Sequence, residues 1–439
     1  AGTGTLDAAS NNTGLGFEVF DDLTSGDDNT GVGYQALTKL TTGTNNTAIG
    51  SLALMDVTTA LANVAVGHSA LENTTGNANT AVGTDAAKTN TSGASNTAVG
   101  KDALFSNTTA SNNTAVGKSA LVANTTGGEN TAVGMTALTA NTTASNNSAF
   151  GTAALAANTT GASNTGLGRA ALEVNTTGAN NTAVGHGSLD ANTTGTQNVA
   201  VGKGSLALNT TGSSNTAVGQ TALTTNTTGA ANVAVGKDAL KSNTTASNNT
   251  AVGYQSQEAT TTGANNSSFG LHALRLNTTG AQNVSVGKGS LTANTTASNN
   301  TAIGNNAMET NTTGANNTAV GGNALNVNTT GASNVAVGQT ALDANTTADN
   351  NIAVGFAALT TNTTGAQNVA VGSASLEVNT TGTNNTAVGF KSLNKNTTAS
   401  YNSAFGYQAL SANTTGERNT AIGRTALEAS TTGDHNVGV

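Results

Sequence analysis

The sequence predicts an all-β fold, a parallel β-solenoid of about 25 coils that share one seventeen-residue repeat. Three observations lead to this prediction. A phrase close to Asn-Thr-Ala-Val-Gly returns with this seventeen-residue period, which fits neither a heptad nor an eleven-residue helical repeat. The abundant Gly, Thr, Asn and Val residues are poor helix formers. Each unit is therefore expected to form one coil of short strands and turns that pairs with the next coil through backbone hydrogen bonds.

Composition and charge exclude several other protein classes. Only 8% of the residues are charged and 36% are hydrophobic, whereas disordered chains usually combine high charge with low hydrophobicity. No Asn is followed by Gly, so the strongest signal for a two-residue antiparallel hairpin is missing. The net charge is -8 and the basic residues form no stripe that could bind nucleic acid. No apolar run reaches the roughly 18 residues of a membrane span. The lack of cysteine excludes disulfides and thiol chemistry.

Each coil is expected to end at the glycine that closes the repeated phrase. These glycines run from Gly16 to Gly423, and only the coil from His68 to Gly83 is one residue short. After the glycine come two variable residues, Ala or Ser, Leu, two variable residues, Asn-Thr-Thr, Gly or Ala, two variable residues and the next strand. The leucine position is interrupted at Gln257 and Ala87. We expect residues 1–16 to form a degenerate N-terminal coil and residues 17–439 to form one continuous, elongated solenoid domain.

Side chains alternate between the two sides of a strand, so the strand at residues 113–117 presents two sets of side chains. Val116 has an apolar equivalent in every coil, and Thr114 exchanges with valine in other coils. We therefore expect Thr114 and Val116 to face inward, and Asn113 and Ala115 to face away from the interior. In two successive coils, we expect the apolar side chains to lie inside and the lysines to lie outside. The expected inside residues are Leu104, Val116, Leu121 and Val133, and the expected outside residues are Lys101 and Lys118.

Asparagine and glycine at fixed positions of the coil predict two further features. The strand asparagines, from Asn12 to Asn436, would lie one strand spacing apart and form a ladder of hydrogen-bonded amides. The Asn-Thr-Thr and Asn-Asn-Thr triplets are also formal glycosylation sequons, but glycans on every coil would collide at a spacing of about 4.8 Å. Gly117 and the glycine of the Asn-Thr-Thr-Gly turn are expected to form corners, because glycine tolerates positive φ.

The predicted apolar core is thin, which favours self-association. Each coil offers mainly one Leu, one Val and one Thr methyl group. Ala115 and its equivalents, small and expected outside, are suited to close contact with another chain. We therefore expect a homotrimer, an end-to-end filament or both. Neither end has a recognisable polar cap, so the terminal coils are expected to be covered by more of the same polypeptide or by a coaxially stacked subunit.

Two stretches of the sequence carry a resemblance to known families. GVGYQALTKLTTGTNNTAIG at 31–50 and FGYQALSANTTGERNTAIG at 405–423 resemble the YQAL/NTTG/NTAVG repeats of bacterial and phage tail-fibre-like proteins. The strand phrase is also similar to the repeated motif of trimeric autotransporter adhesin heads. The first likeness covers nearly the whole chain, and the second covers only the strand. Together they imply a left-handed parallel β-roll in a trimeric fibre, although a coiled-coil stalk, a membrane anchor and a chaperone domain are not recognisable in residues 1–439.

The variable position after each closing glycine is the candidate functional surface. It holds aromatic and basic residues in a chain that is otherwise poor in both, and stacked coils would align them along one ridge. This ridge is either a solvated surface or a contact line for glycans, neighbouring fibres or a cell surface. The candidate contact residues are Tyr34, Lys101, Lys118, Arg169, Lys203, Lys237, Tyr254, Lys288, Phe356, Phe390, Tyr407 and Arg424.

Residues for catalysis or metal binding are too scattered to form a site. The four histidines lie in distant coils: His68, His186, His272 and His435. An acidic group near the N-terminus lacks the spacing of calcium loops and is expected to be a solvated acidic end: Asp21, Asp22, Asp27 and Asp28. We therefore expect no catalytic residue, no cofactor and no metal.

The sequence thus predicts a non-enzymatic structural fibre, an extracellular filament or adhesin shaft at the cell surface. Its expected partners are further copies of the chain, and surface glycans or a host cell surface. A phage tail-fibre shaft for host attachment, located in the virion, is one alternative. An ice-binding solenoid is another, suggested by the regularly repeated Thr, although ice binding needs outward Thr and the strand Thr is expected to face inward.

Overall fold

The computed structural model describes residues 9–439, which contain short strands and turns and no helix. The chain divides into two compact units, which we call unit 1 (Ala1–Asn215) and unit 2 (Thr216–Val439). Both are built from three-residue strands, apart from the two-residue strand at the end of unit 2. The predicted all-β class is confirmed. Residues 1–8 of the predicted N-terminal coil lie outside the described part of the chain.

The described strands recur at the predicted positions of the repeat. Unit 1 contains β1 (Thr13–Leu15), β2 (Thr30–Val32), β3 (Thr47–Ile49), β4 (Val64–Val66), β5 (Thr80–Val82), β6 (Thr97–Val99), β7 (Thr114–Val116), β8 (Thr131–Val133), β9 (Ser148–Phe150), β10 (Thr165–Leu167), β11 (Thr182–Val184) and β12 (Val199–Val201). Unit 2 contains β13 (Thr216–Val218), β14 (Val233–Val235), β15 (Thr250–Val252), β16 (Ser267–Phe269), β17 (Val284–Val286), β18 (Thr301–Ile303), β19 (Thr318–Val320), β20 (Val335–Val337), β21 (Ile352–Val354), β22 (Val369–Val371), β23 (Thr386–Val388), β24 (Ser403–Phe405), β25 (Thr420–Ile422) and β26 (Val437–Gly438).

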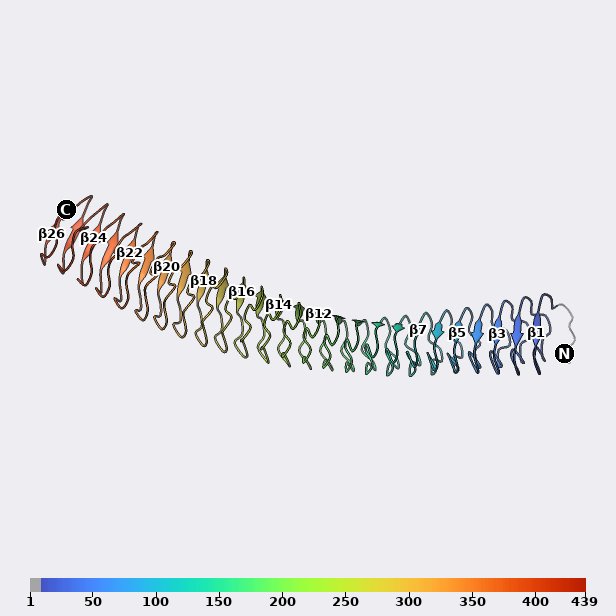
Figure 1. Ribbon diagram of the computed structural model, residues 1–439. Helices are drawn as coiled ribbons and strands as arrows, with labels where there is room; N and C mark the ends of the chain where they lie inside the picture. Colours follow the sequence, from blue (N-terminus) through green and yellow to red (C-terminus); the bar gives the residue numbers. More distant parts are fainter. Residues whose placement is uncertain (1–8) are drawn as a thin grey trace. The chain divides into compact units, whose positions relative to one another are not determined.

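Within each unit, every strand pairs in parallel with the strand of the next coil. In unit 1, Ala115 of β7 lies beside Ala132 of β8, an offset of one full repeat. The short coil is visible between β4 and β5, where Val64 lies beside Thr80. Figure 1 shows the strands of each unit as successive rungs, each followed by a loop that leads to the next rung. The predicted parallel β-solenoid of seventeen-residue coils is therefore confirmed.

The interior of the coil is narrow, and this reverses the predicted orientation of the strand. Ala115 is 0% exposed, whereas Thr114 and Val116 are only half-buried. The central residue is Gly, Ala or Ser in all the described three-residue strands. A methyl group at Gly166 would already lie 3.4 Å from Leu155 Cγ. The strand therefore packs so closely on the core leucine that only a small side chain fits between them.

The face prediction is accordingly corrected in one part and confirmed in another. Val116 and Val133 are not core residues, because both point outward and are half-buried. The other four assignments are confirmed, with full burial for the leucines and exposure for the lysines: Leu104, Leu121, Lys101 and Lys118. Because Ala115 lies in the core, it is not accessible for the contact between chains that was expected there.

Asparagine amides fill much of the remaining interior in two ladders. In the first, Asn113 Nδ2 donates to the carbonyl of Gly127 at 3.0 Å, and Asn113 Oδ1 accepts from the backbone N–H of Asn130 at 2.9 Å. In the second, formed by the Asn-Thr-Thr turn, Asn124 Nδ2 donates to Asn107 Oδ1 at 3.1 Å and to the same Gly127 carbonyl at 2.9 Å. The predicted ladder is confirmed, but its amides point into the coil and not out of it.

Positive φ angles give each coil its corners. Gly117 has a φ of 133°, and a Cβ there would lie 2.6 Å from the carbonyl oxygen of the next closing glycine, so this corner is confirmed. Asn112 and Leu121 also have positive φ, at 60° and 52°. Asparagine adopts this conformation readily and leucine seldom does. The second predicted corner, at Gly127, does not have positive φ; a Cβ there would lie 2.2 Å from a backbone oxygen of the next coil.

The two breaks in the leucine position remain inside the coil. Ala87 is 1% exposed. Gln257 is fully buried in unit 2, where its Nε2 donates to the carbonyl of Thr250 at 2.8 Å and to Ser268 Oγ at 2.8 Å. Its Oε1 has no hydrogen-bond partner. This coil therefore replaces an apolar contact with an incompletely satisfied polar cluster.

Candidate functional site

The predicted ridge is exposed in both units. It consists of the residues that directly follow the closing glycines, and all twelve candidate residues are exposed: Tyr34, Lys101, Lys118, Arg169 and Lys203 in unit 1, and Lys237, Tyr254, Lys288, Phe356, Phe390, Tyr407 and Arg424 in unit 2. The glycine with positive φ before each of them turns the chain out of the strand. No Asp or Glu occupies this position in any coil, so the ridge has a positive charge. Its role as a contact line stays a prediction.

Some aromatic and basic ridge residues of neighbouring coils contact one another. The rings of Phe390 and Tyr407 stack with centroids 5.4 Å apart and an interplanar angle of 21°. The guanidinium of Arg424 lies 5.5 Å from the Tyr407 ring, so three successive coils form one continuous stack. Arg169 Nη1 lies 3.3 Å from His186 Nε2 in unit 1. Stacking and cation–π contacts of this kind hold side chains in place at low entropy cost.

Sequence reasoning missed several members of this surface. Phe17 is also a ridge residue, and its ring stacks on Tyr34 at 5.6 Å with an interplanar angle of 7°. A second exposed column, directly before the strand asparagine, contains Tyr401 with the Arg418 guanidinium 5.6 Å from its ring. The signal in both cases is a separation of one repeat between an aromatic residue and its partner, which becomes meaningful once the coils are stacked.

The outer face of the sheet is a second candidate surface, which sequence reasoning had placed inside. We define the outer face as the first and third residues of each strand. Among the described three-residue strands, the first residue is Thr, Val, Ser or Ile and the third is Val, Ile, Leu or Phe. The third residue remains partly exposed, for example by 43% at Ile49 and 48% at Leu167. The face is therefore uncharged along each unit, with an apolar column of third residues beside a column of first residues that are mostly Thr.

Large and small residues are paired on this outer face. Phenylalanine occupies the third position in three strands, β9, β16 and β24, and the first residue of each is serine. Serine occurs at the first position in no other described strand. Phe150 is 40% exposed, close to the 43% of the smaller Ile49. The pairing keeps the summed size of the two outward side chains nearly constant from coil to coil.

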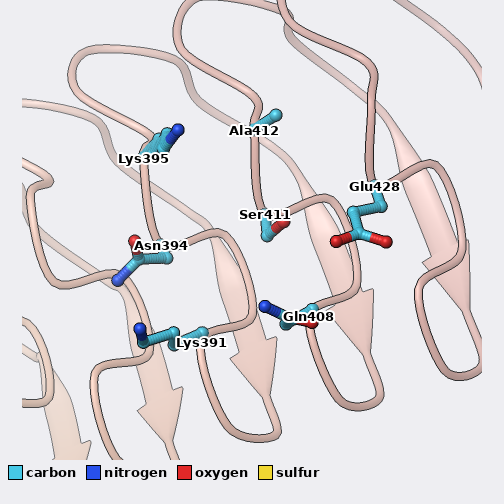
Figure 2. Close-up of a pocket in the computed structure, with 7 residues that line it drawn as sticks. All are labelled: Lys391, Asn394, Lys395, Gln408, Ser411, Ala412 and Glu428. Carbon is cyan, nitrogen blue, oxygen red and sulfur yellow. The ribbon is translucent and has the colours of Figure 1, made fainter.

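Acidic residues gather on a different side of the coil. We call this the acidic column; it consists of carboxylates directly after the core leucine position, at Asp21, Glu72, Glu173, Asp190, Glu258, Glu309, Asp343, Glu377 and Glu428. Some pair with a cation of the next coil, as Glu258 Oε2 does with Arg275 Nε at 3.1 Å. A hollow of about 290 Å³ on this side is lined by residues that include Lys391, Lys395 and Glu428. Figure 2 shows these side chains on neighbouring coils. Every side chain around this hollow is exposed or half-buried, so it lacks the enclosure of a small-molecule site.

Burial raises the pKa of two carboxyl groups of the acidic column. It raises the pKa of Asp343 above its ordinary value of 3.8, because a partly desolvated carboxylate loses hydration energy. The same cause raises the pKa of Asp190, and the nearby His186 partly offsets it. Asp238 lies outside this column, directly after the ridge residue Lys237. Burial acts to raise its pKa, but hydrogen bonds from Thr221 and Lys241 outweigh this effect and leave the pKa lowered. These carboxylates lie in different coils and do not converge on one point.

The remaining candidate residues do not come together. The acidic residues near the N-terminus and the four histidines form no group of three or more ligands for a metal ion within residues 9–439. Asp27 Oδ1 instead accepts from the backbone N–H of Ser10 at 2.6 Å. No helix in this described range is long and apolar enough to span a membrane.

Comparison with known proteins adds no identification. No protein-family model matches the sequence, and no curated protein matches it.

Proposed function

We propose that this chain is a non-enzymatic structural fibre, an extracellular filament or adhesin shaft at the cell surface. The observation that supports the proposal is the sameness of the coils. The described coils share the parallel pairing and the strand asparagine ladder, and nearly all share a buried small residue in the strand and the core leucine. The second asparagine ladder runs from Asn90 to Asn413 and is interrupted at Thr260. An added coil therefore extends the structure by about one strand spacing without requiring any new contact. A shaft in a phage tail fibre would use the same property and is the alternative location.

Deletion of three whole coils tests the shaft directly. Removal of residues 101–151 joins Gly100 to Thr152, which continues the repeat in phase. We expect the shortened protein to fold with unchanged β-structure and to lose about 14 Å of length in solution scattering or electron micrographs. Removal of residues 101–142 is the matched control, because it leaves only residues 143–147 between Gly100 and Ser148, too little chain to bring the next strand into its place in the stack. An in-phase deletion that unfolds unit 1, or that leaves the length unchanged, contradicts the proposal.

The ridge is the surface that we propose for contact with glycans or a host cell. The stack of Phe390, Tyr407 and Arg424 supports this, because fixed aromatic rings and guanidinium groups are typical of recognition surfaces. Replacement of all three by Ala should abolish binding of the labelled protein to its target cells or isolated glycans. Replacement of the exposed Thr109 and Thr126 by Ala should leave binding unchanged. Equal binding by both variants would assign the contact to another surface.

Ice binding is a second candidate, and one observation favours it. Thr114 and its equivalents face outward in a regular column, where sequence reasoning had placed them inside. Against this, the neighbouring column of third residues has no hydroxyl group and includes three Phe. Thermal hysteresis of the purified protein at millimolar concentration would establish the activity, and its absence would remove the candidate.

A further inference from the structure

We propose that the outer face of the sheet binds the same face of a second copy of this chain, with the two copies parallel and in register. This inference rests on the proposed shaft, since it describes how two shafts associate laterally. The expected trimer contact through Ala115 is not retained, because Ala115 is 0% exposed. The partner is identified by three properties of the outer face: its lack of charge, its area and its pairing of large with small residues.

The outer face is uncharged and extends along each unit. A three-residue strand is about 10 Å long and strands repeat about every 4.8 Å. The 12 strands of unit 1 and the 14 strands of unit 2 therefore present about 580 Å² and 670 Å². Each value is close to the roughly 600 Å² that each partner contributes at the lower end of stable protein interfaces.

A two-fold axis along the stacking direction gives the simplest packing of two such faces. Face-to-face sheets pack about 10 Å apart, and this axis keeps both copies parallel with equal coils at equal height. The rotation exchanges the two sides of the face. The first strand residue of each coil then lies opposite the third strand residue of the same coil in the other copy.

The pairing of serine with phenylalanine fits this arrangement. In register, Phe150 of one copy lies opposite Ser148 of the other, and the same holds for β16 and β24. Two phenylalanines never meet, and no gap opens between two serines. An antiparallel arrangement pairs different coils, so it has no reason to couple the two residues of one strand. Solvent exposure alone gives no reason for this coupling either.

Other occupants fit the outer face less well. A charged polymer would find no counter-charge among the first and third strand residues. An ice surface needs regularly placed hydroxyl groups, and the third position has none. A second copy supplies an equally uncharged surface with the same spacing of strands.

Sedimentation equilibrium of the full chain tests the association. We expect a dimer of the 42.5 kDa chain. Val116→Lys with Val133→Lys places charges on the outer face and should raise the dissociation constant by about 100-fold or more, because unpaired charges would be buried. The matched control places the same charges on the exposed Thr109 and Thr126 and should leave the constant unchanged. Melting curves must show both variants folded. A chain that stays monomeric, or a dimer indifferent to the face charges, overturns the proposal.

A size exchange tests the register without adding charge. Ser148→Phe puts two rings opposite each other, and Phe150→Ser leaves a gap. Each should weaken the dimer by about tenfold. The double variant Ser148→Phe/Phe150→Ser restores one large and one small residue at each contact and should recover the wild-type constant within about threefold. If the double variant is as weak as the two single changes combined, the residues do not meet across the interface.

Spin labels measure the direction of the copies, and the chain has no native cysteine to interfere. Single cysteines at Thr84, Lys118 and Lys203 on the ridge of unit 1 should give the same distance between copies at all three sites. An antiparallel pair cannot give equal distances at three sites and would overturn the proposal. Thermal hysteresis from a monomeric protein that is lost with the face charges would also overturn it, in favour of ice. The three-coil deletion reports on the shaft independently of all these results, so failure of the dimer and failure of the shaft are distinguishable.

Discussion

Removal of one rung of the strand ladder, by Asn113→Ala, tests what the buried amides contribute. Asn113 is 1% exposed and lies inside unit 1. The substitution removes the acceptor for the backbone N–H of Asn130, 2.9 Å away, and leaves that buried group unpaired. It also removes the donor to the Gly127 carbonyl at 3.0 Å. That carbonyl keeps its bond from Asn124 Nδ2 at 2.9 Å.

The local cost follows from these contacts. An unpaired buried N–H costs about 1–3 kcal/mol, and the loss of a bond whose acceptor keeps another donor costs about 0.5–1.5 kcal/mol. We therefore expect about 1.5–4.5 kcal/mol of local destabilisation. Since about 1.4 kcal/mol corresponds to a factor of ten, the backbone N–H of Asn130 should exchange its hydrogen roughly 10- to 1,600-fold faster than in the wild type.

Native-state hydrogen exchange, followed by NMR or mass spectrometry, measures this change at the affected coil. Asn113→Asp is a second arm: it keeps the acceptor oxygen but places a buried oxygen opposite the Gly127 carbonyl, so it should destabilise more than Ala at neutral pH. Thr109→Ala, at an exposed position, is the control and should change local stability by less than about 0.5 kcal/mol. Unchanged protection of Asn130 in both Asn113 variants would refute the ladder as a stabilising element.

Three further outcomes follow from buried and exposed positions. Leu172→Asp should destabilise unit 1 by roughly 3–5 kcal/mol in thermal or chemical unfolding, because it buries an unpaired charge. Arg169→Ala on the ridge should leave the stability nearly unchanged. Equal melting temperatures of the two variants would contradict the face assignment. Gln257→Leu should stabilise unit 2 by about 1–3 kcal/mol, because it removes the unpaired Oε1 and restores the usual core residue. A loss of stability in denaturant titrations would show instead that the polar cluster stabilises the coil. Burial raises the pKa of Asp343 above 3.8, so the contribution of this carboxyl group to stability is greatest below that pH and is lost as pH rises through the folded-state pKa. Asp343→Asn should therefore be more stable than the wild type at neutral pH, with a smaller advantage in acid. A stability difference that does not change with pH would contradict this cause.

The repeat period was enough to predict the fold. The constant seventeen-residue spacing of the strand phrases fixes parallel, stacked coils, and the leucine at a constant position predicts the core at Leu104 and Leu121. The strand asparagine at the head of each phrase predicts the ladder, because identical residues meet in a stack. These features depend only on which residues align between coils.

The orientation of the strand could not be predicted from hydrophobicity. Val116 is more apolar than Ala115, yet Ala115 is inside. In a narrow coil the size limit outweighs the hydrophobic preference, because a β-branched residue at the central position would collide with the core leucine. The restriction of that position to Gly, Ala and Ser was the signal in the sequence. The positive φ of Leu121 had no sequence signal of its own, since leucine seldom adopts it.

The sequence predicted the ridge but not the outer face of the sheet. The ridge position was found because aromatic and basic residues are rare elsewhere in the chain. The contacts within it, such as Phe390 with Tyr407, required the stacked geometry. The outer face was missed because its residues had been assigned to the interior, although the coupling of Ser148 with Phe150 was already visible in the sequence.

Cysteine accessibility along one strand is the most direct test of the account, because the central claim is that the coil closes around Ala115 and the asparagines with Thr114 and Val116 outside. Each of Thr114, Ala115 and Val116 is replaced singly by Cys and labelled with a thiol reagent in dilute solution, below the concentration at which copies associate. We predict rapid labelling at Thr114 and Val116, and labelling at Ala115 only after the chain is unfolded. Rapid labelling at Ala115 with protection at Val116 would contradict the account.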